Sequence, residues 1–161
     1  KKGQRQSSGF APTRDPESAK KIQTRRDLLE DRVLTLLPMI PEAVREQELS
    51  GHHLVFTAGL NQDLFHALRG KDIVGVLRDD LQKQLDIIRF KSEVMAQLVA
   101  NPMEEFLVSK RELERESLRE QLVALSEEIR KAERTIGSPE TQPLLESFRT
   151  LSEDLKKLSS F

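Results

Sequence analysis

The sequence from Leu118 to Phe161, LREQLVALSEEIRKAERTIGSPETQPLLESFRTLSEDLKKLSSF, predicts two helices that fold back on each other. Its apolar residues recur in steps of four and three, the a/d rhythm of a heptad repeat. In the first part they are Leu118, Leu122, Leu125, Ile129, Ala132 and Ile136, and in the second part they are Leu144, Phe148, Leu151, Leu155 and Leu158. Between them, Gly137 suits the left-handed end of a helix, and Ser138 followed by Pro139 suits the start of the next.

The residue numbers give the register of this hairpin. Two antiparallel helices joined by a short loop pair residues whose numbers have a constant sum. The pairs Ile136–Leu144, Ala132–Phe148, Ile129–Leu151, Leu125–Leu155 and Leu122–Leu158 all sum to 280. Pro143 would clash inside a helix that began at Pro139, so we expect the second helix to start at Gln142 or Pro143. The alternative is that both stripes are core faces of a globular bundle.

Composition places the chain among helical proteins with thin apolar seams. Of its 161 residues, 37% are hydrophobic and 33% are charged, which is low and high against ordinary globular usage. There is no cysteine, so disulfides, thiolate catalysis and zinc sites built on cysteine are excluded. No run reaches the roughly 18 apolar residues of a membrane span. The first residue is Lys1 rather than Met, so we expect a fragment or a processed product.

Charge is distributed unevenly along the chain. The net charge is −1, yet residues 1–26 carry +6, which leaves −7 for the remainder. The basic side chains of this arm are Lys1, Lys2, Arg5, Arg14, Lys20, Lys21, Arg25 and Arg26. Residues 1–14 are polar, with Gly, Ser and Pro, and we expect a flexible arm. Such an arm could bind phosphates or an acidic partner.

A helix is predicted from Asp15 to Leu37, with Asp15 as N-cap and Pro16 as its first residue. Its apolar stripe is Ile22, Leu29, Val33, Leu36 and Ile40. The stretch Pro38–Pro41 has the PxxP spacing, but the neighbouring leucines favour a buried helix break over a polyproline ligand. A short acidic helix should follow from Pro41 to Ser50.

The segment 54–58 is ambiguous. It could be a strand, but a lone strand has no partner in this chain, so we expect a helix that runs from here to about Arg69. Asp72 then caps a long helix to Ala100. Its expected buried face is Leu77, Leu81, Leu85, Ile88, Met95 and Leu98 or Val99, widened by Ile73, Val74 and Ile87. An apolar arc this wide suits contact with two neighbours.

Asn101, Pro102 and Glu104 mark another helix start, as N-cap, first residue and capping-box acid. From Ser109 to Ser117 this helix is almost entirely charged. The pairs Lys110–Glu114, Arg111–Glu114 and Glu112–Arg115 have helical spacing and contribute about 0.2–0.5 kcal/mol each. We expect a solvated helix that leads into the hairpin.

The residues show no catalytic or metal-binding constellation. Within one helix, His52 and His53 cannot share a metal with His66, because three turns or the wrong face separate them. Gly70-Lys71-Asp72 lacks the glycine spacing of a phosphate loop. Asp79-Asp80 and Glu104-Glu105 are adjacent and point to different sides of a helix. We therefore predict no catalytic residue, no cofactor and no metal.

The sequence predicts an all-α protein, an elongated helical bundle with a C-terminal antiparallel coiled-coil hairpin. It would form one domain, with a basic arm (1–14), a bundle segment (15–100) and a charged helix with the hairpin (101–161). The expected function is a non-enzymatic interaction or scaffolding module, an intracellular (cytoplasmic or nuclear) subunit that forms homo- or hetero-oligomers. Val123, Leu145, Ile73, Val74 and Ile87 are its candidate partner-binding residues, because they widen the apolar faces. The alternative is a nucleic-acid-associated protein that uses the basic arm. The third and weakest hypothesis is an all-α enzyme whose site is built between helices.

Overall fold

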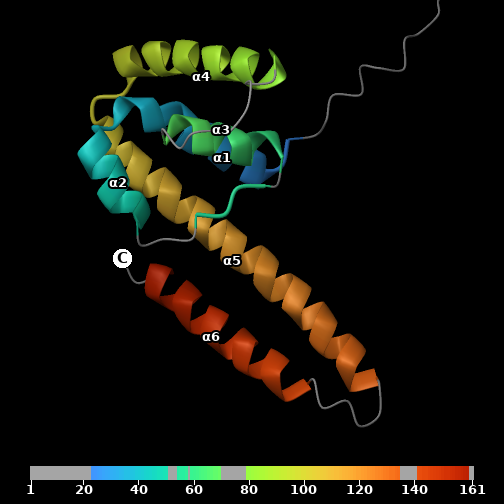
Figure 1. The fold of residues 1–161 in the computed structure, drawn as a ribbon. Coiled ribbons are helices and arrows are strands. Elements are labelled where there is room, and N and C mark those ends of the chain that lie inside the picture. Colours follow the sequence, from blue (N-terminus) through green and yellow to red (C-terminus); the bar gives the residue numbers. More distant parts are fainter. Residues whose placement is uncertain (1–22, 51–53, 58, 70–78, 135–140, 160–161) are drawn as a thin grey trace, which may run out of the picture.

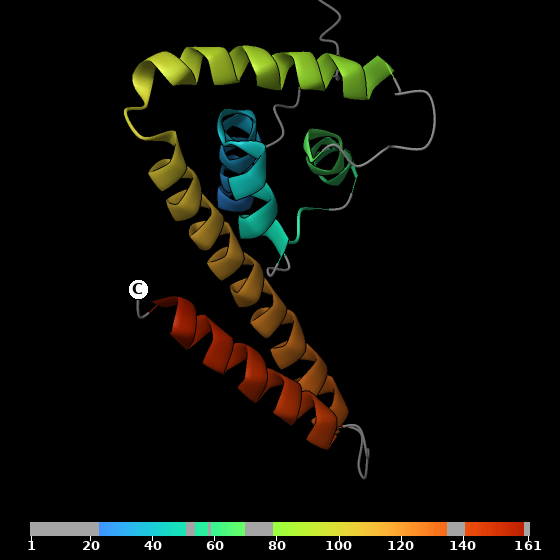
Figure 2. The same cartoon turned by 60° about the vertical axis from the view of Figure 1, so that its left-hand side comes forward.

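The computed structural model describes residues 23–50, 54–57, 59–69, 79–134 and 141–159. Over these ranges the protein is all-α, as predicted, with no strand. The elements are α1 (Arg25–Leu36), the 3₁₀ turn η2 (Leu37–Met39), α2 (Glu42–Ser50), α3 (Leu60–Leu68), α4 (Asp79–Leu98), α5 (Pro102–Arg134) and α6 (Thr141–Ser159). Helix α4 lies across one end of the molecule above α1 and α3, and α5 runs obliquely from it past α1 (Figures 1 and 2).

Helix α1 begins later than the sequence indicated. Thr24 has an extended backbone and its hydroxyl accepts the backbone N–H of Asp27 at 3.1 Å, while Asp27 accepts the N–H of Thr24 at 2.9 Å. This reciprocal capping box makes Arg25 the first residue of α1. The predicted continuous helix from Asp15 is therefore wrong at Gln23 and Thr24, which are not helical. The predicted cap at Asp15 lies outside the described residues.

The predicted break after α1 is confirmed. Pro38 sits in the one-turn η2, and Leu36, Leu37 and Ile40 around it are buried. In a continued α-helix Pro38 would have no backbone N–H to donate, and its ring would clash with the carbonyl group four residues before it. Helix α1 therefore ends here. The short acidic helix that follows is α2.

Residues 54–57 are neither strand nor helix, so the predicted helix from residue 54 is wrong. Gly59 has a positive φ of 105°, a conformation that glycine adopts without strain, and α3 begins only after it. Phe56 is nevertheless buried, with its ring stacked on Phe65 of α3 at 4.5 Å between centroids. The irregular segment therefore belongs to the core.

The start of α5 is confirmed, because the Asn101 side chain accepts the backbone N–H of Glu104 at 3.3 Å. The expectation of a solvated helix at 109–117 is wrong. Ser109, Lys110, Leu113 and Ser117 are buried, and α5 packs against α1 along this stretch. Lys110 donates to the Glu48 carbonyl at 2.7 Å and to its carboxylate at 3.1 Å. The Glu112–Arg115 pair is present at 2.6 Å.

Helices α5 and α6 lie side by side and antiparallel in both views (Figures 1 and 2). Within the described seam Ile129 is buried, and Leu122, Leu125, Ala132, Leu144, Phe148, Leu151, Leu155 and Leu158 are half-buried. Both Arg115 Nε and Nη2 donate to the Leu158 carbonyl, at 3.1 and 2.6 Å, which ties the end of α6 to α5. The pairing by residue sum stays a prediction, and Ile136 lies outside the described residues.

The core lies where α1 meets α3, α4 and α5. Its most deeply buried side chains are Phe106, Leu34, Leu36, Leu37, Leu113, Glu30 and Val33. Six of these seven are apolar, and Glu30 is the exception. Helix α6 has no buried residue and Ile129 of α5 is the one buried residue of the described seam, so the hairpin contributes little to the core.

Candidate interaction surface

The wide apolar arc of α4 forms two separate stripes. The inner stripe is Leu81, Leu85 and Ile88, continued by Ser92, and all four are buried against the core. The outer stripe is Ile87, Phe90, Val94 and Leu98, and all four are exposed, Phe90 by 66% and Leu98 by 75%. At 100° per residue the two stripes are about 140° apart around the helix. The outer stripe is therefore an apolar face that stays largely exposed in the described part of the chain.

A groove of about 710 Å³ adjoins the outer stripe, between α4 and α1. Its lining is Arg25, Leu28, Leu29, Asp31, Arg32, Thr35, Phe90, Lys91, Val94 and Met95. Leu28 is more than half exposed, because it points toward the groove rather than the core. The outer stripe and the groove together form one surface, which we call the α4 surface.

The charged side chains that line the groove have partners within the chain. Lys91 Nζ lies 2.6 Å from Asp31 Oδ1, and Arg25 Nη2 lies 2.7 Å from Glu112 Oε2. Arg32 pairs with Glu105 of α5. Because these charges are balanced locally, the groove offers apolar contact area rather than a converging set of polar groups.

Behind the groove, the buried carboxylate of Glu30 joins α1 to the irregular segment and to α3. Its Oε1 accepts Arg26 Nε at 2.9 Å and the backbone N–H and hydroxyl of Thr57 at 2.7 Å each. Its Oε2 accepts Asn61 Nδ2 at 2.6 Å. Burial would raise the pKa of Glu30, but the hydrogen bonds from Asn61, Arg26 and Thr57 outweigh it and hold this pKa below its ordinary value. The network fixes the position of α1.

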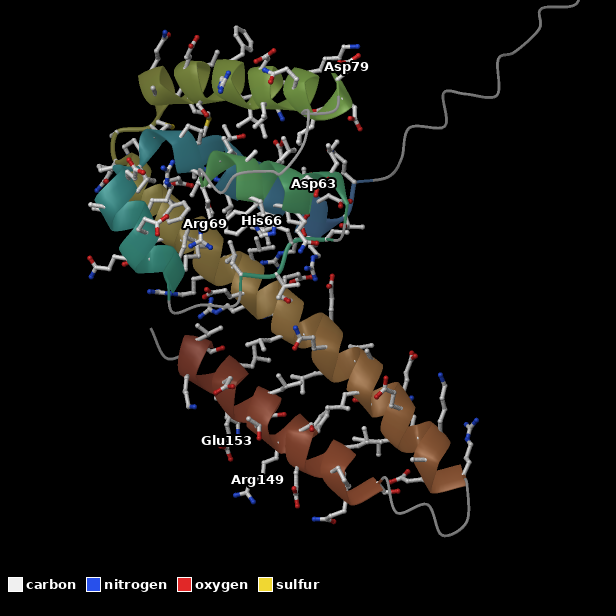
Figure 3. All side chains as sticks on the ribbon, in the orientation of Figure 1. Asp63, His66, Arg69, Asp79, Arg149 and Glu153 are labelled. Atoms are coloured by element: carbon white, nitrogen blue, oxygen red, sulfur yellow. The ribbon has the colours of Figure 1, made fainter. Side chains whose placement is uncertain are left out.

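A second cavity of about 430 Å³ lies beside this network. Its lining is Arg26, Leu54, Val55, Phe56, Thr57, Gln62, Phe65 and His66. The His66 ring lies tilted against Phe65, 5.9 Å between centroids, on the side of α3 where Figure 3 also labels Arg69. Over the described ranges no three His, Asp or Glu side chains are placed to hold a metal ion, and His52 and His53 lie outside them.

The predicted partner-binding residues lie in different parts of the fold. Ile87 belongs to the outer stripe of α4, whereas Val123 of α5 and Leu145 of α6 lie in the hairpin at the other end of the molecule (Figure 1). All three are exposed, Val123 by 62%. Ile73 and Val74 lie outside the described residues. The structure therefore does not gather the five into one site.

Of the basic arm, only Arg25 and Arg26 are described, and both contact acidic side chains of their own chain. Arg25 pairs with Glu112, and Arg26 pairs with Glu30 and Glu120 and donates to the Val55 carbonyl at 2.7 Å. Lys1, Lys2, Arg5, Arg14, Lys20 and Lys21 lie outside the described residues.

Sequence reasoning missed Leu28, Phe90 and Val94, and it placed either Leu98 or Val99 on the buried face, whereas Leu98 is exposed. Leu98 follows Ile87 by eleven residues, which is about three helical turns, so both lie on the same side of α4. The spacing Ile87, Phe90, Val94, Leu98 was the available signal for this face.

No helix of the described chain is long and apolar enough to cross a membrane. In comparisons with known proteins, no family model, no curated protein and no solved structure matches this chain.

Proposed function

We propose that the protein is a non-enzymatic helical interaction module that assembles with another chain through the α4 surface. The single observation that carries this is the outer stripe, four large apolar side chains exposed in succession on the helix that closes one end of the fold. Contiguous exposed apolar surface is uncommon on monomeric proteins and marks binding sites.

The surroundings of the stripe support a protein partner over a small molecule. Ligand pockets combine apolar walls with a few polar groups that converge on the ligand. Here the lining cations Arg25, Arg32 and Lys91 each contact a carboxylate of the same chain. A helix of a partner can cover the stripe and the groove through apolar contact alone.

The rigid mounting of α1 supports the same proposal. Glu30 holds α1 in place from the core side, so Leu28 is presented from a fixed helix. A preorganised surface loses less conformational entropy on association.

Photo-crosslinking tests this function. A photoreactive phenylalanine analogue at Val94 in the full chain should give a discrete protein adduct in the cells that make the protein, and Phe90→Glu in the same chain should abolish it. The same analogue at Arg149, an exposed position on the side of α6 away from α5 (Figure 3), is the control and should give none. Equal labelling at Val94 and Arg149, or no adduct at either, would refute the function.

A further inference from the structure

The centre of the outer stripe has the spacing of one coiled-coil heptad. Ile87 and Val94 take successive a positions and Phe90 the d position between them, while Leu98 lies beside this seam at e and Gln97 takes the following d position. β-branched residues at a, combined with leucine at d, favour two parallel strands, in which each a residue meets its own copy; here Phe90 stands at d in place of leucine. The stripe therefore has the composition to pair with itself.

Charges at the flanks of the stripe complement each other in the same arrangement. Asp86 precedes the first a residue, at g, and Lys91 occupies the next e position. In a parallel pair the g residue of one helix faces the e residue of the next heptad in the other, five positions on. Asp86 would face Lys91 of the second copy, twice by symmetry.

Both side chains are accessible for such a contact. The Asp86 side chain is 61% exposed and the Lys91 side chain 42%. Asp86 accepts a hydrogen bond from Gln82 Nε2 at 3.0 Å and lies 3.5 Å from Arg89 Nη1, and Lys91 lies 2.6 Å from Asp31. None of these contacts is buried. An antiparallel pair centred on the stripe would instead place the Glu93 carboxylates of the two copies beside each other.

We propose that the α4 surface binds a second copy of this chain through parallel pairing of the two α4 helices about a two-fold axis along them. This rests on the proposed function and names its partner. In Figure 2, α1, α3 and α5 all lie on the same side of α4, so two copies can meet through their outer stripes with no other described element between them. Such an interface is isologous, as in most homodimers.

The size of the interface sets the expected affinity. From Ile87 to Leu98 the stripe is about 16 Å long at 1.5 Å per residue. An interface of this length is at the small end of specific interfaces, so we expect a dissociation constant in the micromolar range. Phe90 should be its main anchor, because large aromatic side chains at the centre of an interface dominate binding.

Symmetric disulfide formation tests the geometry, since the chain has no cysteine of its own. In a parallel pair, Val94→Cys meets its own copy within the Cα separation of about 4.4–6.8 Å that a disulfide needs. Mild oxidation of the purified chain should therefore give a covalent dimer of Val94→Cys, while the control Arg149→Cys, on the side of α6 away from α5, stays monomeric. If a dimer forms only in a mixture of Ile87→Cys and Gln97→Cys, which face each other in an antiparallel pair, the helices are antiparallel and the proposal is wrong.

Sedimentation equilibrium of the cysteine-free chain tests the energetics. Phe90→Ser should raise the dissociation constant at least tenfold, and Asp86→Lys should raise it severalfold by placing lysines opposite each other. Glu153→Lys makes the same charge change on α6 and should leave it unaltered. A wild-type chain that stays monomeric into the millimolar range overturns the second copy as partner. An adduct at Val94 to a different protein would then leave the proposed function standing, whereas the absence of any adduct would refute both.

Discussion

Replacing Glu30 by glutamine should destabilise the fold by about 2 kcal/mol, because the substitution keeps the shape of the side chain and removes its charge. The carboxylate is fully buried and accepts four hydrogen bonds, three at Oε1 and one at Oε2. A hydrogen bond to a charged group contributes about 1.5–3 kcal/mol, against about 0.5–1.5 kcal/mol between neutral groups.

The magnitude follows from what glutamine can still accept. A glutamine carbonyl in the place of Oε1 keeps the bonds from Arg26 and Thr57 as weaker, neutral-acceptor bonds. Its NH₂ group then faces Asn61, whose amide must turn over and accept through Oδ1, so the 2.6 Å bond to a carboxylate becomes a bond between two neutral groups. Relief from burying a charge offsets part of this loss. The remainder is about 2 kcal/mol.

Urea unfolding at one fixed protein concentration measures this loss of stability. Far-UV circular dichroism is the readout, because the chain has no tryptophan or tyrosine for fluorescence. The matched control is Glu153→Gln on α6, where an exposed carboxylate accepts Arg149 at 3.2 Å. Exposed pairs contribute about 0.2–1 kcal/mol at most, so the control should change little. If Glu30→Gln cost no more than the control, the Glu30 network would not hold α1 to the 54–61 segment.

Glu30 also makes stability depend on pH, because its pKa is lowered in the folded chain. The stabilisation from the Glu30 carboxylate is therefore fully present above the ordinary carboxyl pKa of about 4.3, and it is lost as the pH falls below that value and through the lowered pKa. Urea titrations from about pH 5 to pH 3 should therefore show a steeper loss of stability for the wild type than for Glu30→Gln. Lys110→Met keeps the buried aliphatic stem but removes both hydrogen bonds to Glu48, so it should lower the free energy of unfolding by about 1–2 kcal/mol in the same assay. An unchanged free energy of unfolding would mean that water satisfies Glu48 instead. Thr24→Ala removes the N-cap of α1 and should cost about 1 kcal/mol, whereas Thr24→Ser should cost almost nothing.

Periodicity was a sound guide wherever a helix contacts its neighbours through one apolar face. Val33 and Leu36 were predicted to lie on the buried face of α1, and Leu81 and Leu85 on that of α4. All four are buried. The sequence showed that the apolar arc of α4 is wide, but Ile87, which was assigned to its buried face, is exposed. Which residues share one face of a helix depends only on their spacing along the chain, and that spacing can be read directly from the sequence.

Features that depend on contacts between distant segments could not be predicted this way. The charged stretch of α5 is half core, because Lys110 reaches a carboxylate and a carbonyl 62 residues away. Glu30 is buried for the same reason, since its donors come from residues 26, 57 and 61. Charged residues in a helix appear solvated until their partners are located. The Thr24–Asp27 capping box, by contrast, was readable and was overlooked.

Helix α5 is one unbroken rod of 33 residues that starts beside α4 and ends at the tip of the hairpin. At 1.5 Å per residue it is about 50 Å long. It acts mechanically as a lever arm: α1 holds the part of α5 from Glu105 to Glu120, and the free part extends beyond it to Arg134. That free part is about 21 Å long at 1.5 Å per residue, so a tilt of about 10° at Glu120 would move the tip of the hairpin by about 4 Å.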